Sequence, residues 1–246
     1  MGVPESRYSG GIPVGEIDRG VSGKQIILLR HGDKIELESY GPHATLVDLA
    51  AATEAFRDQP GLITAGCKGC ALCCYFESIP LTGIDLIRLS RSLNIEPEQL
   101  VETHLTAPTP PSLEARKRGI RDLTRMNGLS SREAAILYEF NQAEPITPKK
   151  RTDGGCTFLD TRLCGIYEDR PFLCMLYVCN MADKLSILHE LIVRQGVWHS
   201  YAVLGWIPEI EISHNPFVGK PSYDKVLLAD FDVNLEKAME DLFFFF

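Results

Sequence analysis

The eight cysteines of this chain fall into two tight groups, and no other feature of the sequence constrains its structure as strongly. The first group has the spacing C-x2-C-x2-C-C and consists of Cys67, Cys70, Cys73 and Cys74. The second group lies further along the chain and consists of Cys156, Cys164, Cys174 and Cys179. Cysteines that only fill a core act as small hydrophobic residues and need no such spacing. Closely spaced thiolates can instead converge on one point, as a metal ion or an iron–sulfur cluster requires.

Composition narrows the class of protein. The chain has 246 residues, of which 45% are hydrophobic, and it carries a net charge of -8. This charge argues against nonspecific nucleic-acid binding, so we expect no nucleic-acid partner. No apolar stretch reaches the roughly 18–20 residues of a membrane helix, so we also expect no membrane partner.

The redox state of the thiols follows from the expected compartment. The first residues show no basic segment followed by an apolar run, as a secretory signal would, and we therefore expect a cytoplasmic protein. Thiols remain reduced in the cytoplasm. In that compartment, clustered cysteines indicate metal ligands or redox catalysts rather than disulfides.

The sequence predicts a mainly helical α+β fold with a small β element near the N-terminus. Residues 1–23 are rich in Gly, Pro and Ser, which predicts a flexible segment. A small β-hairpin and a helix are expected over 24–64, and a cysteine-cluster metal-binding domain over 65–207. That domain contains a helical insertion at about 107–148, and a C-terminal extension follows over 208–246.

Local patterns place the individual elements. Two short strands are predicted over 24–29 and 34–38. Helices are predicted over 45–57, 81–94, 97–104, 112–126, 131–143 and 182–204. Thr82 with Asp85, and Ser130 with Glu133, have the spacing of helix N-terminal capping pairs. The basic residues Arg116, Lys117, Arg118, Arg121 and Arg125 are expected on a solvated helix face.

The cysteine spacing leaves the ligand partition open. A third cysteine at the C-x2-C interval favours a cubane cluster over a simple zinc knuckle. Adjacent side chains point in different directions, so Cys73 and Cys74 are not expected to make equivalent bonds to one small ion. Eight thiols allow two four-cysteine sites, one cluster with a dithiol, or one cluster with spare thiols.

The two groups together resemble the CxxCxxCC family of zinc- or iron-chelating domains. The resemblance covers about residues 65–180. It is carried by the first group, by GCTFL from Gly155, by CGIYE from Cys164, and by Arg170-Pro171 before Cys174. One departure is Met175, where the family usually has arginine. Arg170 either offsets thiolate charge or is a surface residue before a proline.

The resemblance implies a metal centre that ties the loop after residue 65 to the segment 156–179. All eight cysteines form the expected ligand pool, and the expected cofactor is an iron–sulfur cluster, with 4Fe-4S favoured, or zinc. The biochemical role is then redox chemistry, sensing or metal handling. Flagellin lysine methylases carry a similar cluster, so an enzyme that uses the centre on a substrate is one alternative. A purely structural zinc site in an interaction protein is the other.

Replacing one central cysteine tests this assignment. Because metal binding and folding are coupled when the ligands are far apart in the chain, we expect Cys70→Ser to lose metal and to lower the melting temperature together. Elemental analysis and thermal unfolding measure the two effects. An unchanged metal content in Cys70→Ser would remove Cys70 from the ligand pool.

Overall fold

The computed structural model describes residues 17–18, 25–31, 34–57, 71–76, 78–176, 181 and 183–231. Three of the eight cysteines, Cys67, Cys70 and Cys179, lie outside these residues. Most of the predicted N-terminal segment and the end of the predicted C-terminal extension lie outside them as well.

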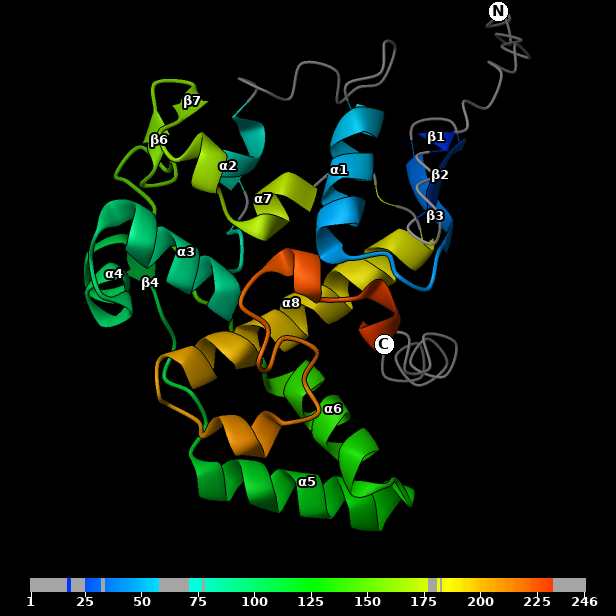
Figure 1. Cartoon of the computed structure of the whole chain (residues 1–246). Helices are drawn as coiled ribbons and strands as arrows, with labels where there is room; N and C mark the ends of the chain where they lie inside the picture. Colours follow the sequence, from blue (N-terminus) through cyan, green and yellow to red (C-terminus); the bar gives the residue numbers. More distant parts are fainter. Residues whose placement is uncertain are drawn as a thin grey trace, which may run out of the picture.

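A three-stranded antiparallel sheet forms near the N-terminus, in the order β1-β2-β3. Its strands are β1 (Ile17–Asp18), β2 (Ile26–His31) and β3 (Lys34–Tyr40). Every second side chain is buried, namely Ile26, Leu28, Ile35 and Leu37, because successive residues of a strand face opposite sides. This face packs against helices α1 (Leu46–Arg57) and α8 (Asp183–Val203), as Figure 1 shows. The predicted hairpin is confirmed.

Helix α3 (Gly83–Leu93) forms where the capping signal placed it. Thr82 is the N-cap, and its side chain and that of Asp85 form the reciprocal capping box. Asn94 ends the helix in the left-handed conformation, with φ of 54°, and α4 (Pro97–His104) follows. Helix α3 packs closely on α8. Gly196 of α8 allows this approach because it has no side chain, and a methyl group there would meet Thr82 Cγ2 at 2.5 Å. The predicted helices over 81–94 and 97–104 are therefore confirmed.

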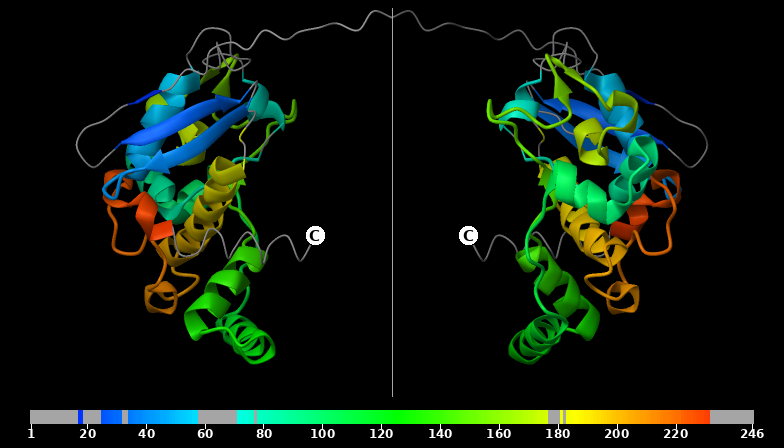
Figure 2. Two further views of the ribbon diagram at one scale, coloured as in Figure 1. Left: turned by 90° about the vertical axis from the view of Figure 1, so that its right-hand side faces the viewer. Right: turned by 90° about the vertical axis from the view of Figure 1, so that its left-hand side faces the viewer.

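Helices α5 (Leu113–Asn127) and α6 (Ser131–Gln142) form a hairpin at one end of the molecule (Figure 2). Two-residue strands close its base, where β4 (Leu105–Thr106) pairs with β5 (Thr147–Pro148). One prediction here is wrong, because Arg116 is only 2% exposed and pairs with the buried carboxylate of Glu139. Its guanidinium also lies over the Trp198 ring, with 5.6 Å to the centroid. The buried ion pair thus joins α5 to α6, and the contacts of Trp198 with Arg116 and with the Glu139 carbonyl join the hairpin to α8.

The long helix α8 forms the centre of the core. The predicted helix over 182–204 is confirmed, and its inner face buries Leu185, Leu188, Leu191, Ile192 and Trp198. Three 3-10 turns after it add buried residues to the same core: η2 (Glu209–Ile212), η3 (Tyr223–Lys225) and η4 (Leu228–Phe231). Main-chain hydrogen bonds from Leu46 N to Val226 O (3.0 Å) and from Leu228 N to Ala44 O (2.8 Å) join this segment to the start of α1.

Short elements complete the described chain: α2 (Leu72–Phe76), β6 (Leu159–Asp160), β7 (Leu163–Cys164), η1 (Tyr167–Asp169) and α7 (Phe172–Leu176). The observed fold is mainly helical α+β, as predicted. None of the helices in the described part of the chain combines the length and apolar character needed to cross a membrane.

The buried His199 makes stability depend on pH. It is 5% exposed and stacks on Phe217 with ring centroids 5.7 Å apart. Burial lowers its pKa from 6.5 to about 4. Between these values the unfolded chain binds more protons at this site, so stability decreases as pH falls through the window and levels off below about pH 4.

We therefore expect a loss of up to about 2 kcal/mol in the free energy of unfolding between pH 7 and pH 5 from His199. A glutamine has no charge to gain, so His199→Gln should show a smaller loss over the same interval. Urea unfolding of both proteins at the two pH values measures the difference. Equal pH dependence in the two proteins would contradict this account.

Candidate metal centre

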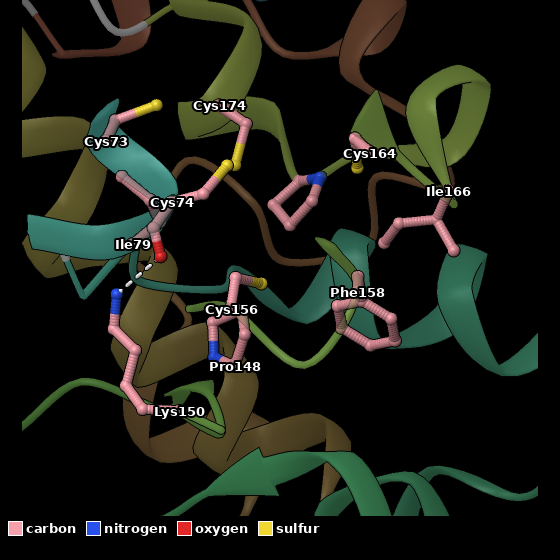
Figure 3. A pocket seen from close by; sticks show the side chains of 11 residues that line it. Cys73, Cys74, Ile79, Pro148, Lys150, Cys156, Phe158, Cys164, Ile166 and Cys174 are labelled. Carbon is pink, nitrogen blue, oxygen red and sulfur yellow. Dashed lines mark hydrogen bonds between the residues drawn. The ribbon is translucent and has the colours of Figure 1, made fainter. Parts of the chain in front are cut away.

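Five cysteines from separate segments line one narrow pocket. They are Cys73 and Cys74 on α2, Cys156 in the loop before β6, Cys164 on β7 and Cys174 on α7. The rest of the lining is apolar apart from one lysine, and consists of Ile79, Pro148, Lys150, Phe158, Ile166 and Pro171. The cavity volume is about 40 Å³, room for roughly three water molecules. Figure 3 shows the cysteine side chains around this space.

Main-chain contacts join the two cysteine groups directly. Cys156 N donates a hydrogen bond of 2.9 Å to Cys74 O. Lys150 pairs with Cys156 through a β-bridge, and its Nζ donates to the same Cys74 carbonyl at 2.9 Å. Ala71, with φ of 59°, sets the turn that begins α2, and Cys74 N bonds to its carbonyl at 3.0 Å. The polypeptide itself thus holds these segments of the two groups together.

A compact loop presents Cys156 and Cys164. Gly155 N bonds to Asp153 Oδ1 at 2.9 Å, and Arg151 binds both the Asp153 carboxylate and Leu159 O. The guanidinium of Arg151 lowers the pKa of Asp153 to about 2. The pair therefore stays ionised at neutral pH and fixes the turn just before Cys156, and the bond from Arg151 to Leu159 O ties this turn to the strand that follows Cys156.

The Asp85 carboxylate positions the helix that carries Cys174. Its Oδ2 accepts from Thr82 N at 3.0 Å within α3, and its Oδ1 accepts from Phe172 N at 2.9 Å, the first residue of α7. Burial raises the pKa of Asp85, while hydrogen bonds from Tyr223, Thr82 and Phe172 oppose that rise. One carboxylate thus satisfies the N-terminal amides of two helices.

Arg170, which lies between Cys164 and Cys174 in the chain, is buried. Its guanidinium binds Glu54 Oε1 at 2.8 Å and stacks over the Tyr167 ring, 4.0 Å from the centroid. The side chain is 9% exposed, so the surface alternative for Arg170 is wrong. Its positive charge also acts to lower the pKa of Cys164, which agrees with the charge-offsetting alternative.

Four thiols of the pocket, those of Cys74, Cys156, Cys164 and Cys174, have raised pKa values. The pKa of Cys74 is raised mainly by a hydrogen bond with Cys73 and, to a smaller extent, by burial. Burial is the main cause that raises the pKa values of Cys156, Cys164 and Cys174, and neighbouring thiolates add to each. Several thiolates in one small space therefore need a bound cation to balance them, and a metal that enters must displace protons.

The donor set fits a soft metal. Several thiol sulfurs gathered in one place suit zinc or an iron–sulfur cluster better than magnesium or calcium, which prefer oxygen ligands. Within the described ranges, no three His, Cys, Asp or Glu side chains already sit close enough to hold a single ion. The five thiols thus surround a space and do not meet at one point.

Sequence reasoning found the cysteines that gather here but missed their neighbours. Lys150 stood only in a short basic run, and Ile79 and Phe158 carried no signal of proximity to the centre. Their contacts join residues far apart in the chain, for example 76 positions between Lys150 and Cys74. No local pattern reports such a contact.

The double role of Asp85 can be tested against a matched carboxylate. Asp48 caps α1 in the same way, accepting from Thr45 N at 2.9 Å, and α1 itself carries no cysteine. We expect Asp85→Asn to lower the free energy of unfolding by about 3 kcal/mol, and Asp48→Asn by about 1 kcal/mol. Metal content should fall only in the first variant. Equal losses of stability and metal in both, measured by urea unfolding and elemental analysis, would contradict the link between α3 and α7.

Comparison with known proteins agrees with this pocket. Neither the curated proteins nor the solved structures include a significant match to the chain. The family model of CxxCxxCC, described as "Putative zinc- or iron-chelating domain", matches residues 66–191. This range contains both cysteine groups and is more than half of the chain. The chain therefore belongs to the CxxCxxCC family of zinc- or iron-chelating domains.

Proposed function

We propose that this protein binds an iron–sulfur cluster of the 4Fe-4S type through cysteine thiolates and works in electron transfer or redox sensing. The single observation that carries the proposal is the pocket that five cysteines from both groups line. The ligands come from a pool of eight: Cys67, Cys70, Cys73, Cys74, Cys156, Cys164, Cys174 and Cys179.

The number and spread of the thiols favour a cluster over one zinc ion. A structural zinc takes four ligands at about 2.3 Å, which places tetrahedral sulfurs within about 4 Å of each other. Five thiols of the described part of the chain line this pocket, one more than such a site uses. No three of the described candidate ligands are as close together as a single ion requires. A cubane holds its four cysteine sulfurs further apart, at its corners.

The protein supplies charge balance and exclusion of water. Ile79, Phe158 and Ile166 form apolar walls around the thiols, and such walls limit solvent access. The positive charge of the buried Arg170 partly offsets thiolate charge at Cys164. When bound, a cluster supplies one-electron redox chemistry. The small volume leaves no space for an organic substrate beside it, which favours electron transfer or sensing over substrate conversion.

Anaerobic purification followed by spectroscopy and elemental analysis tests the proposal. We expect a brown protein with broad absorption near ~400 nm that dithionite bleaches, with iron and acid-labile sulfide in equal amounts. Cys156→Ala should lose most of this absorption. Ser222→Ala provides the control, because Ser222 bonds to Asp224 near the C-terminal end of the described chain and contributes nothing to the pocket. A colourless protein with zinc and no sulfide would contradict the cluster, although it would still support a cysteine metal site.

A further inference from the structure

Lys150 lines the cysteine pocket and is exposed to solvent. Among the described residues, it is the one charged side chain in the lining. Its Nζ donates to Cys74 O at 2.9 Å and to Tyr75 O at 3.3 Å, so it caps the C-terminal turn of α2. The hydrogen bond to Cys74 O is the dashed line in Figure 3.

The same lysine reaches both cysteine groups. Its backbone forms a β-bridge with Cys156, while its ammonium holds the carbonyl of Cys74. A cation at the end of a helix also compensates the partial negative charge of the helix carbonyls. Lys150 thus links the two groups through its main chain and its side chain, and brings positive charge to the thiols.

We propose that Lys150 is a positioning residue for the metal centre. Lys150 holds α2 against the Cys156 loop and stabilises the more negative state of the bound group. This inference rests on the proposed cluster. A nearby cation favours the reduced form of a cluster, which carries one more negative charge, and therefore raises the reduction potential. Because Lys150 is exposed to solvent, salt should screen this effect.

The chain contains a matched control at the preceding position. Lys149 Nζ also donates to two carbonyls at a helix end, Glu102 O at 2.6 Å and Thr103 O at 3.5 Å on α4. Helix α4 (Pro97–His104) carries no cysteine, and Lys149 does not line the pocket. The two lysines therefore make the same kind of cap, and only one of them lies at the centre.

The test compares the midpoint potential of the full-length, anaerobically purified protein in four variants. We expect Lys150→Met and Lys150→Gln to shift the potential to more negative values, because both remove the charge. Lys150→Arg should restore it, and Lys149→Met should leave it at the wild-type value. The shift should shrink as salt is raised from low to high concentration. Glutamine retains a donor for the Cys74 carbonyl, so it separates the loss of charge from the loss of the hydrogen bond.

A second measurement does not depend on the cluster. The full-length protein is stripped of metal with a chelator, and Zn²⁺ is added in competition with a coloured chelator. Loss of a group that orients metal ligands typically weakens affinity by about 10- to 100-fold, and we expect this for Lys150→Met and not for Lys149→Met. A wild-type protein without iron and sulfide would overturn the cluster, and the Zn²⁺ comparison would then decide the role of Lys150 alone.

Two results would overturn the role of Lys150. One is a wild-type potential and Zn²⁺ affinity in Lys150→Met, which would mean that the cap is dispensable. The other is an equal effect of Lys149→Met on either measurement, which would mean that any lysine on this surface acts in the same way.

Discussion

The arrangement of helices around the cysteine pocket depends on the buried carboxylate of Asp85. This side chain is only 1% exposed, and burial of a charge is costly unless hydrogen bonds replace the lost water. Asp85 receives them from the amides that begin two helices, α3 and α7. Each helix start lacks intrahelical partners for its first amides. The Asp85 carboxylate accepts a hydrogen bond from one amide at the start of each helix. It thereby fixes the position of Cys174, on α7, relative to the core.

The raised pKa values of the pocket thiols follow from the small volume and the mainly apolar lining of the pocket. Its walls are apolar, and the thiols resist ionisation because each thiolate would be buried beside others. In the protonated state the cysteines are close to neutral hydrophobic residues, so the pocket costs little to assemble. The positively charged side chains near the thiols, Lys150 and Arg170, differ in burial. Arg170 is tied to Glu54 in the interior, and Lys150 stands at the solvent side.

Features of this structure that depend on residues close together in the chain are predictable from the sequence, and features that depend on contacts between distant residues are not. The caps at Thr82 and Ser130 are local, and the helices they begin were placed within a residue or two. Arg116 was placed wrongly because its burial depends on Glu139 and Trp198, on two other helices. A site shared by the two cysteine groups is predicted from the thiol spacing and the family resemblance, and the described cysteines of the two groups do line one pocket. The lysine beside them is not predicted, because nothing in a run of basic residues tells which one faces a distant carbonyl.

The hydrogen bond from Cys156 N to Cys74 O has a consequence for how motion at the centre can be observed. An amide proton exchanges with solvent only when its hydrogen bond opens. Because this bond joins the two cysteine segments, the Cys156 amide is a built-in reporter of their separation. Its exchange rate measures how often the pocket opens, and the factor by which metal slows that rate measures how firmly the ligands close it.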